Sequence, residues 1–128
     1  MKKYLIILLV LFSFGCKTIV IEDEIPNEYF AEVIGIKDGD TIEVLYTKQS
    51  IVIRLEHIDC PEKKQPFGKK AKQFVSDNIY RKNVKIISNG KTDRWKRTIA
   101  VIEMEDGKNL NKMLVKNGLA MHFKKYSK

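Results

Sequence analysis

Alternating hydrophobic and polar residues predict three β-strands in the first half of the chain, at residues 29–37, 40–47 and 51–56. Successive side chains of a strand point to opposite faces, so this alternation places one hydrophobic face toward a core. In the third run the inward residues are hydrophobic and the outward residues include a cation: Ile51, Ile53 and Leu55 against Arg54. We therefore expect three short, half-buried strands.

Turn residues separate these three runs. Asp38-Gly39 predicts a tight hairpin turn between the first two, because glycine tolerates the positive φ that such a turn requires. Residues 48–50 predict a second turn before the third strand. Three consecutive strands joined by tight turns form a meander.

After Gly68 the hydrophobic period changes from two residues to between three and four, which predicts a helix up to Ile79 with one buried stripe. Two further strands are expected at residues 83–88 and 98–104, separated by a turn at Asn89-Gly90 and a basic loop at 91–97. A short second helix is expected from about Asn109, ending at Gly118 as the residue after the helix. The stripe of the first helix consists of Ala71, Phe74, Val75 and Ile79, and that of the second of Leu110, Met113 and Leu114.

Five short strands with a helix between the third and the fourth predict a mostly β fold with some α (α+β). The arrangement expected is a small, five-stranded, partly open OB-fold barrel with two helices. Barrels of this type bind oligonucleotides or oligosaccharides, but a fold alone does not define a function.

The composition changes this picture in one respect, which is charge. The chain has 128 residues, enough for one domain, and carries 24 Lys and Arg against 16 Asp and Glu, a formal charge of +8. This excess favours a polyanionic partner, either nucleic acid or an anionic membrane surface.

The N-terminal segment reads as a targeting sequence. Two lysines precede a hydrophobic run that is too short to span a bilayer comfortably, so residues 1–15 are expected to be a signal peptide. Cys16 follows a small residue and resembles the lipidation site of a bacterial lipoprotein. We expect an exported protein that is anchored to an envelope membrane through Cys16, or else secreted after ordinary cleavage; an uncleaved anchor is the third alternative. Residues 16–28 are then a tether, unless residues 18–21 add an edge strand, and residues 29–128 form the domain.

Charged residues gather around the third predicted strand. Arg54 lies on that strand, Asp59 and Glu62 follow it in a loop broken by a proline, Asp40 follows the first hairpin turn, and Arg97 begins the fifth strand. Taken singly, each is typical of a solvated turn or surface position. Cys60 is typical of a small buried residue rather than a nucleophile, because no histidine is spaced to pair with it. His57 and His122 are each interpreted as structural.

These residues occur in an order that resembles the staphylococcal nuclease (thermonuclease) family. The resemblance covers roughly residues 29–126 and rests on Asp38-Gly39-Asp40-Thr41, Arg54-Leu55, residues 58–62, Phe67-Gly68, residues 92–97 and residues 111–120. It implies a calcium-dependent endonuclease that cuts DNA and RNA, single-stranded or frayed, to leave 3′-phosphate ends, and that acts as a monomer.

The resemblance also implies residue roles. Asp40, Asp59 and the main-chain carbonyl of Cys60, where the family usually has Thr, would bind Ca²⁺, a cation that takes mostly oxygen ligands. Arg54 and Arg97 would grip phosphate oxygens, and Glu62 would activate or position the water. Arg94, Trp95 and Tyr126 would contact substrate, Trp95 by stacking on a base.

The chain departs from the family pattern at two points. Lys96 stands where the family often has Gly, and the sequence lacks the C-terminal helix with which the family usually continues. We expect the missing helix to leave apolar surface uncovered. Two other functions stay open at this point: a non-catalytic OB-fold module that binds nucleic acid, and a structural envelope lipoprotein.

Overall fold

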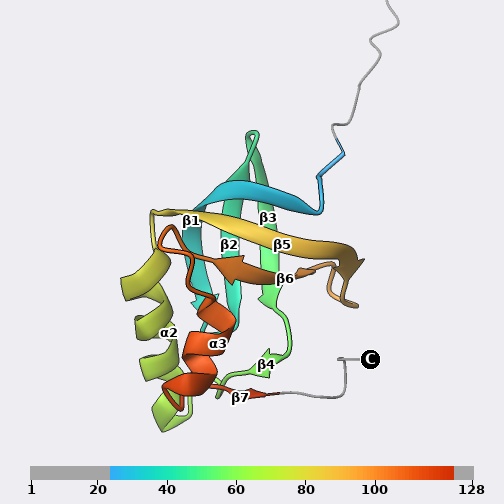
Figure 1. Ribbon diagram of the computed structural model, residues 1–128. Coiled ribbons are helices and arrows are strands. Elements are labelled where there is room, and N and C mark those ends of the chain that lie inside the picture. Colours follow the sequence, from blue (N-terminus) through green and yellow to red (C-terminus); the bar gives the residue numbers. More distant parts are fainter. Residues whose placement is uncertain (1–23, 123–128) are drawn as a thin grey trace, which may run out of the picture.

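The computed structural model describes residues 24–122 as a closed five-stranded barrel with two helices, which confirms the predicted OB-fold, α+β class (Figure 1). The elements in chain order are β1 (Glu28–Asp38), β2 (Thr41–Tyr46), β3 (Gln49–Leu55), β4 (Ile58–Asp59), α2 (Pro66–Ile79), β5 (Asn83–Thr92), β6 (Thr98–Glu103), α3 (Leu110–Lys116) and β7 (Met121–His122).

The barrel closes in the order β1-β2-β3-β6-β5. β1 is long enough to pair with both of its neighbours, with β5 through its first half and with β2 through its second, and the exchange occurs at Glu32. β3 and β6 form the one parallel contact of the barrel, limited to Ile53–Leu55 against Thr98–Ala100. Figure 1 shows β1 bending as it passes from one partner to the other.

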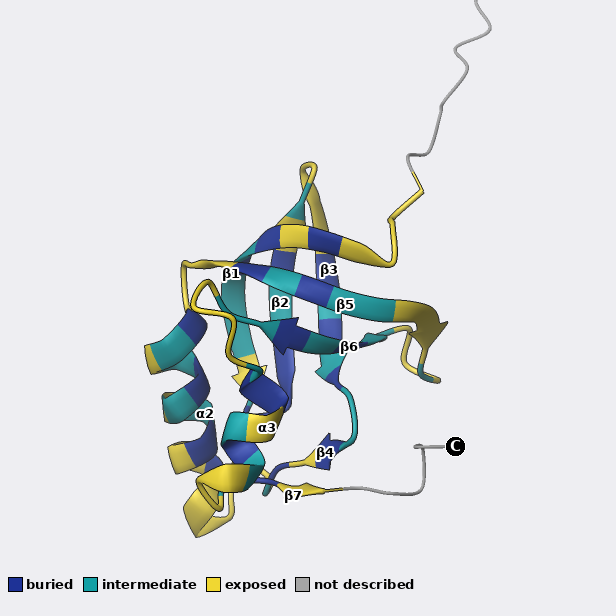
Figure 2. Ribbon diagram, in the orientation of Figure 1, coloured by how far each residue is buried: buried dark blue, intermediate teal, exposed yellow. Residues whose placement is uncertain are grey.

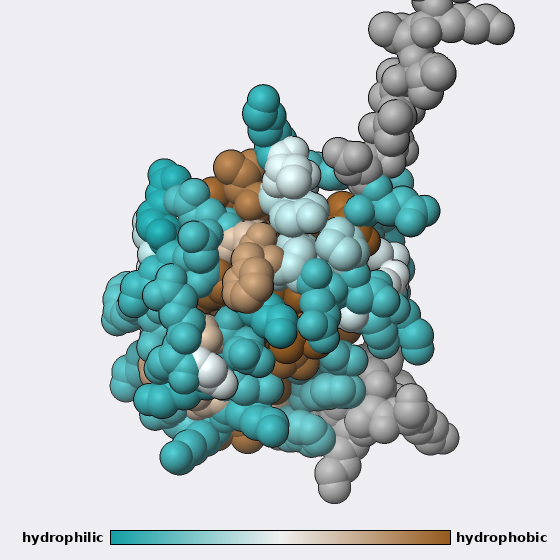
Figure 3. All heavy atoms as spheres, turned by 45° about the horizontal axis from the view of Figure 1, so that its top comes forward, coloured by the Kyte–Doolittle hydropathy of each residue, from teal (hydrophilic) through white to brown (hydrophobic). Residues whose placement is uncertain are grey.

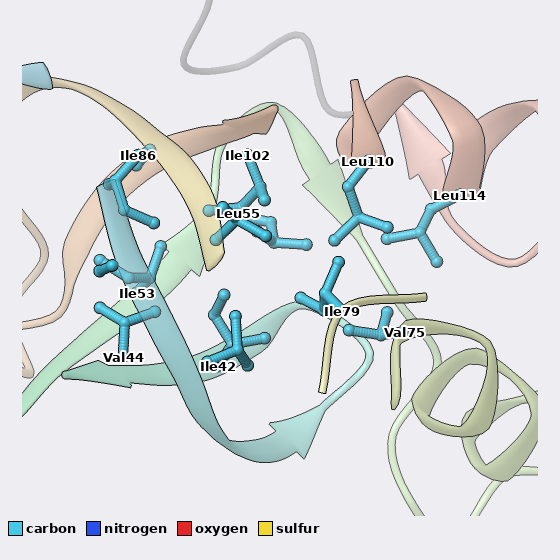
Figure 4. Close-up of a cluster of buried hydrophobic side chains, with 14 of the residues drawn as sticks. Ile42, Val44, Ile53, Leu55, Val75, Ile79, Ile86, Ile102, Leu110 and Leu114 are labelled. Atoms are coloured by element: carbon cyan, nitrogen blue, oxygen red, sulfur yellow. The ribbon is translucent and has the colours of Figure 1, made fainter. Parts of the chain in front are cut away.

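The core lies inside the barrel and beneath the two helices, which cover one end of it (Figures 1 and 2). In Figure 4 the side chains of α2 and α3 point toward those of β2 and β3. Burying a single aliphatic side chain stabilises the fold by roughly 1.5–3 kcal/mol. The packing of α2 and α3 against β2 and β3 therefore fixes the strand ends that carry the charged residues. The fully buried members include Ile42, Ile53, Leu55, Val75, Ile79, Leu110 and Leu114.

The first hairpin turn differs from the prediction in position and in cause. Asp38 pairs with Thr41, so Gly39 and Asp40 form the turn. Gly39 is not among the described glycines with positive φ. A Cβ at Gly39 would instead lie 2.7 Å from Cβ of Ala71 and 3.0 Å from Sγ of Cys60. The glycine is required by close packing against α2, not by backbone conformation.

The second turn lies one residue earlier than predicted. Tyr46 pairs with Gln49, and Thr47 and Lys48 adopt positive φ of 42° and 66°, as a two-residue hairpin turn demands. The predicted turn at 48–50 was therefore wrong, because two residues other than glycine, Thr47 and Lys48, adopt the left-handed conformation.

Two further differences concern the basic loop before β6 and the short strands β4 and β7. β5 runs through Asn89-Gly90 to Thr92, with irregular pairing between Ser88 and Thr92, so the basic loop shortens to Asp93–Arg97. The short strands β4 and β7 pair with each other and were not predicted, because two residues carry no periodicity.

The predicted signal peptide, the lipidation site Cys16, most of the tether and Tyr126 lie outside the described residues. Between residues 24 and 122, no helix is both long enough and apolar enough to cross a membrane. The face shown in Figure 3 is mostly hydrophilic, with smaller hydrophobic areas between the polar side chains.

Candidate active site

Asp40 is a buried carboxylate with three neighbours. The β1–β2 turn carries it, and only 9% of the residue is exposed. Its Oδ1 accepts a hydrogen bond from the Thr41 hydroxyl at 3.1 Å, and its Oδ2 accepts one from the Cys60 amide at 3.1 Å. The Arg54 Nη2 lies 3.5 Å from the same Oδ2. Burial of a carboxylate is costly unless it is paired and hydrogen-bonded, and here both oxygens are satisfied.

Arg54 joins this carboxylate to a second one. Its position on the outward face of β3 follows from the strand alternation. Nη1 donates to the carbonyls of Leu55 and Ile58, each at 2.9 Å, which fixes the guanidinium against the chain. Nη2 then lies 3.5 Å from Asp40 Oδ2 and 3.5 Å from Asp59 Oδ1. Asp40 and Asp59 therefore flank one nitrogen on the same side of the barrel, although 19 positions separate them in the sequence.

Arg97 connects to this group through Thr41. Its Nε donates to Asp93 Oδ2 at 2.6 Å, and its Nη1 donates to the Thr41 hydroxyl oxygen at 3.2 Å. Because the same hydroxyl donates to Asp40, Thr41 links the arginine of the loop to the acidic pair. The sequence alone assigns no role to Thr41, since a threonine in a strand carries no chemical signal of its own.

Asp93 holds the loop that carries Arg97. Burial raises its pKa, but hydrogen bonds from the Arg97 backbone and side chain and from the Trp95 backbone outweigh burial, so the pKa falls below its ordinary value of 3.8. Lys96 adopts a φ of 63°, the left-handed conformation that favours glycine. The loop thus keeps its tight turn at the position where the family pattern often has Gly.

Glu62 lies apart from these groups. The loop between β4 and α2 exposes it to solvent, and no ion-pair partner for its carboxylate is found within the described part of the chain. Its backbone is nevertheless fixed, because its amide donates to the Gln65 side chain at 2.9 Å. A Cβ at Gly68 would lie 1.9 Å from the Glu62 carbonyl oxygen, so this loop packs directly on the first turn of α2.

Cys60 contributes its backbone rather than its thiol. Burial, with the carboxylate of Asp40, raises the thiol pKa to about 12, so the thiol stays protonated at neutral pH. The thiolate is the nucleophilic form of cysteine, and the structure agrees with the interpretation of Cys60 as a small buried residue.

Trp95 is exposed to 62%, and two guanidinium groups contact its ring. The Arg94 guanidinium carbon lies 4.1 Å from the ring centroid and that of Arg97 lies 5.1 Å from it. Asp93 and Thr41 hold Arg97, whereas Arg94 is exposed, so Arg94 is the more weakly held of the two guanidinium groups at the ring.

The donor set at this site suits a hard cation. Asp40 and Asp59 supply carboxylate oxygens, which are ligands of the kind Ca²⁺ prefers. The main-chain carbonyl of Cys60 is the third oxygen ligand that the family resemblance implies. No group of three or more His, Cys, Asp or Glu side chains suited to a metal ion occurs among residues 24–122. Water or substrate oxygens would therefore have to complete the coordination of a cation here.

The structure therefore defines an OB-type barrel that gathers two arginines and two aspartates at the ends of its strands. The particular family follows from sequence comparison. Residues 52–128 match the family model described as staphylococcal nuclease homologue, and the chain belongs to this family.

Relatives with curated descriptions are named as nucleases. An uncharacterized endonuclease of Haemophilus influenzae is 47% identical over 97 residues, covering 74% of this chain and 53% of that protein. A micrococcal nuclease of Shigella flexneri is 36% identical over 109 residues, covering 79% and 62% respectively. An uncharacterized endonuclease of Escherichia coli O157:H7 is 31% identical over 127 residues, covering 99% and 77%. The chain thus spans about half to three fifths of the length of the first two relatives.

Proposed function

We propose that this protein is an endonuclease that hydrolyses phosphodiester bonds of DNA and RNA and leaves 3′-phosphate ends. The observation that carries the proposal is the continuous group Arg97–Thr41–Asp40–Arg54–Asp59, which unites two guanidinium groups and two carboxylates from separate segments. Family membership and relatives named as nucleases support it.

The arginines offset the charge of the phosphate. A guanidinium presents parallel N–H donors that match two oxygens of a phosphate, and its attraction grows as charge accumulates at phosphorus. Arg54 and Arg97 are held by carbonyls and by Asp93, so little reorganisation is needed when substrate binds. Held in this way, Arg54 and Arg97 bind the phosphodiester and orient it.

Glu62 provides the remaining group. Its exposed carboxylate takes a proton from a water, and the water oxygen bonds to phosphorus. The bond from phosphorus to the 5′ oxygen breaks, and that oxygen takes a proton from solvent water to become a 5′-hydroxyl. The phosphate stays on the 3′ side, and Glu62 returns its proton to solvent. Asp40, Asp59 and the Cys60 carbonyl would hold a Ca²⁺ ion. When bound, that ion supplies positive charge next to the phosphate.

Two conservative substitutions test these roles. Glu62→Gln is expected to lower the cleavage rate of single-stranded DNA by about 10²–10⁴-fold, and Arg97→Lys by about 10²–10³-fold. Glu105→Gln and Arg81→Lys, which make the same chemical changes at exposed positions away from the site, are the matched controls. Unchanged rates in both site variants would sink the assignment. Salt-dependent binding without any cleavage by the wild type would favour a non-catalytic nucleic-acid-binding module instead.

We also propose that the protein is exported and anchored through Cys16. The basic start, the short hydrophobic run and the small residue before Cys16 support this. Incorporation of labelled fatty acid into the wild type but not into Cys16→Ser is the expected result. Incorporation into neither protein would contradict lipidation.

A further inference from the structure

A groove of about 770 Å³ lies beside the charged site. Its walls are the end of β1 with Lys37, the start of β3 with Gln49 and Val52, and the loop with Trp95 and Lys96. Asp59 and Glu62 do not line it. Most of the side chains that line the groove therefore lie outside the charged site, which shares only Thr41 and Arg97 with it.

The strand pairing explains why the groove is open. β3 pairs with β6 only over Ile53–Leu55, so its first four residues have β2 on one side and no strand on the other within the described chain. The loop after β5 stands across this opening. The register of β1 shifts between Ile36 and Asp38, which leaves Lys37 as an extra residue. Bulges of this kind re-aim a side chain, and Lys37 lines the groove.

The chemistry of the lining fits a single nucleic-acid strand. Lys37, Lys96 and Arg97 supply positive charge against the single carboxylate of Asp38. Trp95 offers an exposed aromatic ring, while Gln49 and its neighbour Ser50 offer neutral donors and acceptors. A cationic groove that combines backbone contacts with an aromatic stacking platform is the usual design for single strands.

The groove is continuous with the charged site, because Arg97 and Thr41 belong to both. A strand held at one phosphate by Arg97 therefore has a path along β3. We infer that this groove is a second subsite, which binds the nucleotides of a single strand next to the cleaved phosphate. The inference rests on the proposed function, and it makes affinity depend on strand length.

Binding and cleavage of oligothymidylates of three and nine nucleotides test this inference. Trp95 is the single tryptophan of the chain and lines the groove, so its fluorescence reports binding, measured in the Glu62→Gln background. We expect the nine-mer to bind at least about tenfold more tightly than the three-mer. Lys37→Glu should lower the affinity for the nine-mer at least about fivefold and change the affinity for the three-mer by no more than about twofold. It should also reduce the slope of log affinity against log salt concentration by about 0.7.

A second variant changes affinity in the opposite direction. Gln49→Lys adds a cation to the groove and is expected to tighten the nine-mer selectively. Lys82→Glu, the same charge reversal at an exposed position outside the groove, is the matched control and should change neither length. An unchanged ratio of nine-mer to three-mer affinity in both groove variants would overturn the inference.

Cleavage by the wild type separates this inference from the proposed function. If the wild type cleaves but both groove variants keep its length preference, the proposed subsite is contradicted and the proposed nuclease activity is supported. If the wild type binds with the expected length dependence but cleaves nothing, the subsite stands and the nuclease is wrong.

Discussion

At the scale of single residues, Thr41 links the arginine of the loop to the acidic pair. Its hydroxyl accepts from Arg97 and donates to Asp40, so one oxygen sets the distance between the loop and the acidic pair. The residue is buried, with 4% of its surface exposed.

Thr41→Val keeps the shape of this side chain and removes both hydrogen bonds. Arg97 then loses one of its two anchors, and a displacement on the order of 1 Å in such a group costs about 10²-fold in rate. We expect cleavage to fall by about that factor, measured as kcat/KM on single-stranded DNA. Thr41→Ser keeps the hydroxyl and should retain most of the activity; equal loss in both variants would contradict the role of the hydroxyl.

The Cys60 thiol gives a second prediction at this scale. Its pKa of about 12 in the folded protein, against an ordinary value of 9.0, leaves about a thousandfold less thiolate at pH 8. In a Cys16→Ser background, Ellman's reagent should therefore label Cys60 slowly in the folded protein and rapidly in urea. Equal labelling rates in the two states would contradict the buried, protonated thiol.

At the scale of elements, the loop Asp93–Arg97 depends on one carboxylate. Asp93 accepts from Arg97 and from the backbone of Trp95, which lowers its pKa. A lowered pKa stabilises the fold above the unfolded value of 3.8, and this contribution disappears as the pH falls through the folded value.

Asp93→Asn should therefore destabilise the protein most at neutral pH, by about 2 kcal/mol for the loss of a charged hydrogen-bond acceptor. Urea unfolding at several pH values measures the difference between wild type and variant. We expect the difference to narrow as the pH falls below 3.8, because the unfolded chain then binds a proton at Asp93 that the folded protein, with its lowered pKa, does not yet bind. If the difference in unfolding free energy stayed constant as the pH fell to the pKa of Asp93 in the folded protein, an electrostatic origin would be ruled out.

Gly68 shows how a helix positions the loop before it. A methyl group at this position would meet the Glu62 carbonyl oxygen at 1.9 Å and would push the loop away from α2. Gly68→Ala should lower both stability and cleavage, the latter by about 10²-fold, since Glu62 moves with its backbone.

Gly35→Ala is the matched control, because a Cβ there has only ordinary contacts at 3.5 Å with Glu43. Urea unfolding and kcat/KM measured on both variants decide the point. If Gly68→Ala cleaved as fast as Gly35→Ala, the position of Glu62 would not depend on this packing.

The elements also show what the sequence allows one to predict. The alternation of residues 51–56 and the stripe of Ala71, Val75 and Ile79 predicted β3 and α2, because burial on one face leaves a period in the sequence. The turn at Thr47-Lys48 and the pair β4–β7 were not predicted, since they depend on tertiary contacts that leave no such period.

At the scale of the whole molecule, the barrel unites residues that are distant in the sequence. The order of strands brings the β1–β2 turn, the end of β3 and the loop before β6 to one side, so Asp40, Arg54, Asp59 and Arg97 meet. The residue types and their order allowed this group to be predicted. The bridge through Thr41 required the three-dimensional fold, because it depends on where the loop with Arg97 meets the start of β2. The groove along β3 required it too, because it depends on which part of β3 lacks a neighbouring strand.

In the proposed function these groups act together on one phosphodiester with the help of Ca²⁺. The most direct measurement is cleavage of a 5′-labelled single-stranded DNA by the purified protein, with Ca²⁺ and then with excess EGTA, followed by treatment of the products with a 3′-phosphatase. We expect cleavage with Ca²⁺ alone and a mobility shift of the products on phosphatase treatment. Equal cleavage in EGTA, or products that already end in a 3′-hydroxyl, would contradict the account.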